Sequence, residues 1–140
     1  MTLLLDTHFL IWLVLRSERL AEFPWIDRHR PWGVSPVSFL EIQFLAEIGR
    51  LSVRNPEFMR AVMDDARFTV DDVPLVTVVR HALSLDWTRD PFDRLLVAHS
   101  AARRVAFCTL DRRIRARHPI LPPELRRSRA GGGANPRAST

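Results

Sequence analysis

The sequence predicts a three-layer α/β/α domain with a central parallel sheet of four or five strands. Short apolar runs typical of buried strands recur along the chain, and segments with helical spacing of about 10 to 15 residues lie between them. A length of 140 residues suits one domain with one sizeable core. We expect residues 1–125 to form this domain. The basic, Gly-rich residues 126–140 are expected to form a disordered tail.

The strands are expected at short apolar stretches. Residues 3–5 and 105–110 read as fully buried strands, and each is followed directly by an aspartate. Residues 34–37 form a third stretch, and residues 68–70 and 118–121 are two further candidates. Together they supply the four or five strands of the predicted sheet.

The helices are expected where apolar residues recur at helical spacing: residues 9–15, 38–50, 53–66 and 91–103. Asn55-Pro56 and Asp90-Pro91 have the residue types that begin helices. Residues 75–85 fit a helix by spacing and a strand by their valine content, so both alternatives stay open.

The composition excludes several classes of chemistry. Lysine is absent, so all 21 basic residues are arginine, and no Lys Schiff base or Lys-containing phosphate loop can form. A single cysteine, Cys108, excludes an internal disulfide and a Cys-rich zinc site, which favours a reducing, cytoplasmic location. No apolar stretch approaches the length of a membrane-spanning helix, so we expect no membrane partner. The net charge of +5 is concentrated late in the chain, where a polyanion such as nucleic acid would bind.

Four carboxylates stand in apolar surroundings. Asp6 and Asp111 each follow a predicted strand, and ligand sites of parallel sheets lie at the carboxyl ends of strands. Glu41 and Asp93 have mostly apolar neighbours at helical spacing, where an acid is costly unless it is paired or binds a cation. A structural explanation remains open, because Asp is common where strands end and Asp90 and Asp93 can cap a helix.

These carboxylates would form a metal site if the fold brought them together. Within about 5 to 6 Å of each other, each ionised pair would repel by roughly 3 kcal/mol at an effective dielectric constant of 20. Either some of the acids are then protonated or a divalent cation lies among them. Oxygen ligands without Cys or clustered His favour Mg²⁺ or Mn²⁺, and such a site suits phosphodiester hydrolysis.

Four segments of the chain resemble the VapC-like toxin group of PIN-domain ribonucleases, in the order and with the spacing usual in that family. They are LLLDTHFLIWL at 3–13, VSPVSFLEIQFLAEIGRL at 34–51, RDPFDRLLVAHSA at 89–101 and FCTLDRRI at 107–114. The resemblance covers roughly residues 2–122 and implies a PIN-like α/β/α fold. His99 departs from it, because similar sequences often carry Gln at this position.

The resemblance also implies roles for individual residues. The family's four metal-binding, catalytic acids match Asp6, Glu41, Asp93 and Asp111, which would hold Mg²⁺ or Mn²⁺ for RNA cleavage. Asp90 matches an additional acid, and Thr109 matches a hydroxyl residue that steadies the site by hydrogen bonding. A homodimer and a cognate antitoxin protein that blocks the groove are implied as well.

A basic cluster just after Asp111 has two interpretations. Arg112, Arg113 and Arg115 either grip RNA phosphates beside the metal or belong to a solvated face. The four tryptophans lack interleaved basic residues, so most of them are expected to be packing residues. Ser100 and Cys108 are expected to be packing residues as well.

The sequence therefore predicts a Mg²⁺-dependent endoribonuclease, the toxin of a toxin–antitoxin pair. The alternative is a non-catalytic RNA- or protein-binding module, in which the acids cap helices and pair with arginines.

Overall fold

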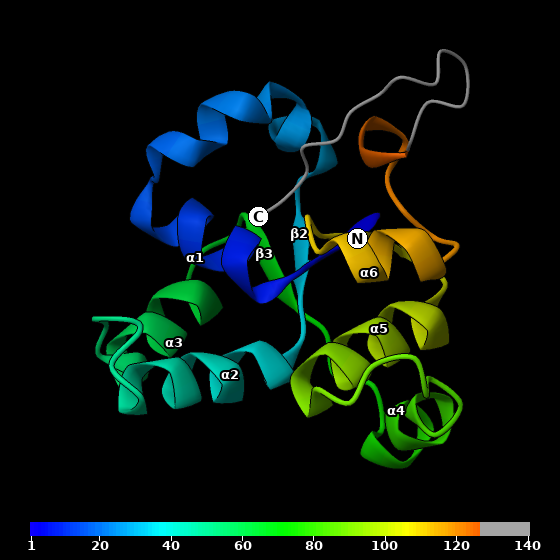
Figure 1. The fold of residues 1–140 in the computed structure, drawn as a ribbon. Helices are drawn as coiled ribbons and strands as arrows, with labels where there is room; N and C mark the ends of the chain where they lie inside the picture. Colours follow the sequence, from blue (N-terminus) through cyan, green and yellow to red (C-terminus); the bar gives the residue numbers. More distant parts are fainter. Residues whose placement is uncertain (127–140) are drawn as a thin grey trace.

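The computed structural model describes residues 1–126 and contains a four-stranded parallel sheet (Figure 1). The sheet has the order β3-β2-β1-β4, with strands β1 (Leu3–Leu5), β2 (Trp32–Val34), β3 (Phe68–Val70) and β4 (Ala106–Cys108). The predicted disordered tail lies, apart from Arg126, outside the described residues.

Helices connect the strands, as a parallel sheet requires. The α-helices are α1 (Thr7–Leu15), α2 (Pro36–Glu47), α3 (Asn55–Met63), α4 (Leu75–Ala82), α5 (Pro91–Arg103) and α6 (Arg112–Arg117). Short 3₁₀ segments are η1 (Glu18–Glu22), η2 (Pro24–His29) and η3 (Pro123–Leu125). Between Met1 and Arg126, no helix has the length and hydropathy needed to cross a membrane.

Alternating side chains of β1 define two hydrophobic cores. Leu3 and Leu5 belong to a core with apolar residues of α1, α2 and α3, whereas Leu4 belongs to a second core with residues of α5 and α6. Successive residues of a strand point to opposite faces, so the sheet lies between two helical layers. This arrangement confirms the predicted three-layer α/β/α fold.

Side-chain caps begin the helices that follow β1, β2 and β4. Asp6, Ser35 and Asp111 cap α1, α2 and α6, and each accepts a hydrogen bond from a backbone N–H of the helix that it begins. Ser35 and the Pro36 that follows start α2 at residue 36 rather than at the predicted residue 38, and they end the preceding strand at Val34.

Two other uncertain segments are resolved. Leu75–Ala82 is a helix, in agreement with its apolar spacing rather than its valine content. The predicted strand at residues 118–121 is wrong. One ladder-like bond does form, from the Phe107 N–H to the Ile120 carbonyl at 3.0 Å. Pro119 and Pro122 have no N–H to donate, so pairing does not extend.

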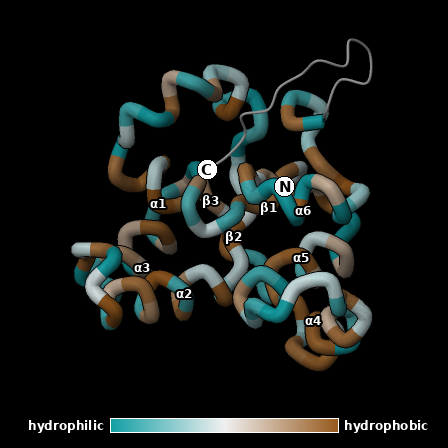
Figure 2. The backbone as a smooth tube through the Cα atoms, in the orientation of Figure 1, coloured by the Kyte–Doolittle hydropathy of each residue, from teal (hydrophilic) through white to brown (hydrophobic). Residues whose placement is uncertain are grey.

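Apolar side chains remain exposed on the outer faces of two helices. On α2 they are Leu40 and Phe44, followed by Ile48 just after the helix, and on α4 they are Leu75, Val76 and Val79, followed by Leu83. Figure 2 shows hydrophobic colour along both helices. Several exposed apolar side chains on one helix are a feature of protein interaction sites.

Candidate functional site

Asp6 and Asp111 lie at the same edge of the sheet. Their strands, β1 and β4, are parallel neighbours in which Leu5 is opposite Cys108, and the Asp6 N–H donates to the Cys108 carbonyl at 2.9 Å. Each aspartate follows its strand and caps the next helix. The carboxyl edge of the sheet therefore holds two carboxylates side by side, as expected for a ligand site of a parallel sheet.

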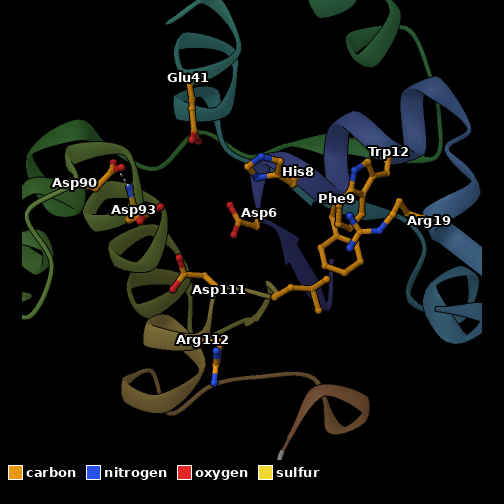
Figure 3. Close-up of a pocket in the computed structure, with 11 residues that line it drawn as sticks. Asp6, His8, Phe9, Trp12, Arg19, Glu41, Asp90, Asp93, Asp111 and Arg112 are labelled. Atoms are coloured by element: carbon orange, nitrogen blue, oxygen red, sulfur yellow. Dashed lines mark hydrogen bonds between the residues drawn. The ribbon is translucent and has the colours of Figure 1, made fainter. Parts of the chain in front are cut away.

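Helices α2 and α5 bring further carboxylates to this edge. Glu41 comes from α2, and Asp90 and Asp93 come from the start of α5. All five acids line one cavity (Figure 3). The volume of this cavity is about 630 Å³. Its other lining residues are His8, Phe9, Trp12, Arg19, Leu110 and Arg112.

Asp6 is fixed from both of its carboxylate oxygens. The Thr7 N–H donates to Oδ1 at 2.7 Å, and the Thr109 hydroxyl donates to Oδ2 at 2.6 Å. Thr109 also accepts a hydrogen bond from the Asp111 N–H at 3.0 Å, so this one hydroxyl connects the two strand-end acids. Burial raises the pKa of Asp6, and the hydrogen bonds from Thr109 and Thr7 counteract this effect.

Glu41 and Asp93 both have strongly raised pKa values. Burial, followed by the charges of Asp6 and Asp90, raises the pKa of Glu41 to about 7, although the Thr7 hydroxyl acts in the opposite direction. Burial also raises the pKa of Asp93 to about 8, with further contributions from Asp90, Asp6, Asp111 and Glu41 in that order. The negative charges of the acids therefore repel one another. Without a cation, Glu41 and Asp93 retain protons near neutral pH.

Asp90 has a structural role at the same position. Its Oδ1 accepts hydrogen bonds from the Phe92 N–H at 2.9 Å and the Asp93 N–H at 3.2 Å, which confirms that it caps α5. Asp93 is not the capping residue. Its carboxylate lines the cavity instead, directly beside a capping carboxylate that repels it.

The donor set fits a divalent cation in its chemistry. Glu41 Oε1 is buried and has no hydrogen-bond partner, although burying an unsatisfied carboxylate oxygen is costly. Across residues 1–126, no arginine or histidine forms a salt bridge with any of the five cavity carboxylates. A cation bound among these oxygens would give Glu41 Oε1 a partner and would balance the charge of the unpaired carboxylates.

The acids nevertheless do not form a ready-made ligand cage. In the part of the chain that the structure describes, no three His, Cys, Asp or Glu side chains are grouped closely enough to hold a metal ion together. Mg²⁺ commonly uses only one or two carboxylates directly and keeps several water ligands. The carboxylates thus share a cavity, and any cation there would be bound in part through water.

The arginines after Asp111 differ in position. Arg112 lines the acidic cavity and also an adjoining one, which Arg113 lines as well. Arg113 reaches the Trp87 carbonyl at 3.5 Å. Arg115 lines neither cavity, because its guanidinium donates to the Leu125 carbonyl at 2.8 Å. Arg115 therefore points toward Leu125 rather than into either of these two cavities.

The sequence analysis did not single out Arg19, and it expected most of the tryptophans to be packing residues without setting Trp12 apart. Both line the acidic cavity, and the Arg19 guanidinium carbon lies 4.4 Å from the Trp12 ring centroid. His8 and Trp12 are four residues apart on α1 and share a helix face. Because His8 lies two residues after Asp6, this spacing could have indicated that Trp12 also faces the cavity. No comparable signal exists for Arg19, because the turn after α1 carries η1 back toward the cavity.

Other polar clusters lie away from the cavity. The predicted packing residues Ser100 and Cys108 are fully buried, and the Ser100 hydroxyl donates to the Val105 carbonyl at 2.6 Å. His99, the departure from the family pattern, is buried and lies 2.8 Å from Asp71. The hydrogen bonds of Ser100 and His99 thus connect α5 to neighbouring segments of the fold and have a structural role.

Comparisons with known proteins agree with this geometry. The chain is 32% identical over 123 residues to Ribonuclease VapC22 of Mycobacterium tuberculosis (strain ATCC 25618 / H37Rv), which covers 84% of this chain and 94% of the relative. The fold is similar to VapBC2 from Rickettsia felis bound to a promoter DNA fragment, with a TM-score of 0.61 and 14% identity over 87% of this chain and 98% of that one. It is also similar to a toxin–antitoxin complex from Klebsiella pneumoniae, with a TM-score of 0.60 and 15% identity over 86% and 96% of the two chains. Residues 3–118 match the PIN domain, and the chain therefore belongs to the PIN-domain family.

Proposed function

We propose that this protein is a metal-dependent endoribonuclease that hydrolyses RNA phosphodiester bonds as the toxin of a toxin–antitoxin pair. The observation that carries the proposal is a cavity lined by five carboxylates, none of them in a salt bridge within residues 1–126, at the carboxyl edge of a PIN-type sheet. The relative that covers most of the chain is named a ribonuclease, and the neighbouring folds come from toxin–antitoxin complexes, which supports the assignment. We expect it to act in the cytoplasm, because a single cysteine favours a reducing compartment.

The cation would be Mg²⁺ or Mn²⁺, held by Asp6, Glu41, Asp93 and Asp111. When bound, such an ion neutralises phosphate charge and lowers the pKa of a coordinated water. Thr109 and the Thr7 N–H keep Asp6 oriented. Glu41 and Asp93 would lose their protons as the cation binds, and Asp90 adds negative charge beside Asp93.

The cationic side chains beside the acids would hold the RNA backbone. Arg112 lines the acidic cavity and Arg113 the adjoining one, so their guanidinium groups stand where phosphates on one side of the cut would pass. Arg115 is left out of this proposal because it is bound to the Leu125 carbonyl.

The cognate antitoxin and a second copy of the chain are the proposed protein partners. The exposed apolar side chains of α2 and α4 supply surface that such partners would cover. Phe44 on α2 also contacts Phe92 near the acidic cavity, with ring centroids 5.6 Å apart. A partner on α2 would therefore lie close to the entrance of the site.

A non-catalytic binding module is the alternative. It predicts that the acids cap helices and pair with arginines. Asp6, Asp90 and Asp111 do cap helices. No described cavity carboxylate is in a salt bridge, however, and Glu41 and Asp93 begin no helix, so capping alone leaves two half-buried acids unexplained.

The test is cleavage of total cellular RNA by the purified protein in Mg²⁺ and in EDTA. Cleavage should require the metal and be lost in Asp6→Asn and Glu41→Gln, while Asp64→Asn, at an exposed acid after α3, should cleave normally. Wild-type RNA cleavage in EDTA, or unchanged cleavage by both site variants, would contradict the proposal.

A further inference from the structure

One wall of the acidic cavity is built from aromatic and cationic side chains. His8 and Trp12 of α1 and Arg19 of η1 line it, and Figure 3 shows them beyond Asp6 from the carboxylates of α5. Metal binding and hydrolysis need carboxylates and water, and neither step explains an indole and a guanidinium at this position. This wall therefore requires a separate explanation.

The Trp12 indole is fixed in place by packing. Its ring lies 5.1 Å from Phe9 in an edge-on contact and 6.2 Å from Phe23 in a parallel one, measured between ring centroids. Phe9 and Phe23 are buried, whereas Trp12 is only partly buried and reaches the cavity. The result is a rigid aromatic surface that binding does not have to order.

Arg19 lies over this surface. Its guanidinium carbon is 4.4 Å from the Trp12 centroid, within the range of cation–π contacts. The side chain is 44% exposed, and its pairing with Glu22 is long, at 3.9 Å. Its N–H groups are thus available to a ligand in the cavity.

We propose that His8, Trp12 and Arg19 form a nucleobase subsite, in which the base next to the cleaved phosphate stacks on the Arg19–Trp12 pair. This inference rests on the proposed function, because it takes RNA as the ligand of the cavity. Aromatic rings and guanidinium planes are the surfaces on which the bases of single-stranded RNA stack. The cavity volume of about 630 Å³ is in the range of ligand-binding pockets.

The charge distribution supports this placement. Arg19 and Arg112 are the arginines of the cavity lining, and they stand on different sides of Asp6 (Figure 3). A strand held at both points would place a phosphate over the carboxylates, with Arg112 on one flank and the stacked base on the other. A base can reach the Arg19–Trp12 pair only when it is unstacked, so the subsite selects loops and single strands over duplexes.

The experiment measures binding of short single-stranded oligoribonucleotides that carry the fluorescent base 2-aminopurine at successive positions. Asp93→Asn protein serves as the background so that the probe is not cut. We expect fluorescence to be quenched by stacking at one position. Adding Arg19→Gln should weaken binding about fivefold or more and diminish that quenching, and Trp12→Leu should abolish it.

The matched control is Arg54→Gln, which removes another exposed arginine that pairs with a glutamate three residues later. It should leave affinity and quenching unchanged. Equal loss of affinity in both arginine variants, or quenching that is absent at every position or unchanged in Arg19→Gln, would overturn the subsite. Arg19→Gln decides the outcome if Trp12→Leu unfolds, because Arg19 lies at the surface.

Cleavage of the same RNA by wild-type protein in Mg²⁺ separates this inference from the proposed function. Position-specific quenching without cleavage would leave the subsite standing and remove the nuclease activity. Cleavage without position-specific quenching would support the nuclease activity and overturn the subsite.

Discussion

The carboxylate at the end of β3 and those of the acidic cavity have opposite electrostatic surroundings. At the end of β3, Asp71 lies 2.8 Å from both the His99 ring nitrogen and the Arg103 guanidinium, which hold its pKa below the usual value despite burial. In the acidic cavity, burial and then the neighbouring acids raise the pKa of Asp93 to about 8. Within residues 1–126, Asp71 is thus paired with cationic or ionisable partners, whereas none of the five cavity acids forms a salt bridge. This difference supports the proposal that the cavity binds an external cation.

The largest expected effect is on RNA cleavage. Asp93→Asn should slow Mg²⁺-dependent cleavage at least about 100-fold, because a proposed metal ligand and its charge are lost. Asp71→Ala should cleave at close to the wild-type rate per folded molecule. Initial rates on one RNA, corrected for the folded fraction, make the comparison. Similar losses in the two variants would contradict the distinction between the regions.

The second prediction concerns stability, which Asp71→Ala should lower although it leaves cleavage nearly unchanged. Asp71→Ala should lower the free energy of unfolding by about 2 kcal/mol at pH 7, because the buried His99 ring loses its hydrogen-bond partner. Urea unfolding followed by circular dichroism measures this loss. An unchanged midpoint would show that the Asp71 contacts do not hold β3 to α5.

The third prediction concerns pH. The pKa of Asp93 is raised from 3.8 to about 8, so its protonated form stabilises the fold, and this contribution is lost as the pH rises from about 4 to about 8. Asn mimics the protonated acid. Metal-free Asp93→Asn should therefore be more stable than the wild type by about 2 kcal/mol at pH 8 and equally stable at pH 4. The expected difference is smaller than the full pKa shift implies, because the side chain is partly exposed to solvent. An equal difference at both pH values would exclude titration of this carboxyl.

The smallest expected effect follows from Thr109. Thr109→Val removes the hydroxyl that donates to Asp6 and accepts from the Asp111 N–H, so the pKa of Asp6 should rise further. We expect cleavage to fall by about tenfold, with the acid limb of its pH profile moved to higher pH. Thr109→Ser, which keeps the hydroxyl, should restore both. An acid limb that does not move would show that Thr109 acts on packing alone.

The sequence predicted the parts of the site that follow from strand order. Asp6 and Asp111 end apolar runs, and parallel pairing of β1 with β4 brings them to one edge. The apolar neighbours of Glu41 at helical spacing are Val37, Phe44, Leu45 and Ile48, which predict a core-facing position for Glu41. Val37 and Leu45 do pack against the cores, but Phe44 and Ile48 are 45% and 48% exposed, so the prediction was only partly right.

Tertiary contacts explain the positions of two further residues. Arg115 of α6 donates to the Leu125 carbonyl, and local sequence does not determine that contact. Arg19 reaches the cavity through the turn between α1 and η1, which is a tertiary feature without a residue pattern. Both depend on how elements meet, whereas Asp6 and Asp111 depend on the strand that precedes them.

Calorimetric titration of the metal-free protein with Mn²⁺ in two buffers of different ionisation enthalpy tests the central claim most directly. Because Glu41 and Asp93 hold protons at pH 6, cation binding should release about one to two protons, and the release should disappear in the Glu41→Gln, Asp93→Asn double variant. Binding of Mn²⁺ without proton release, or equal release by the double variant, would contradict the account.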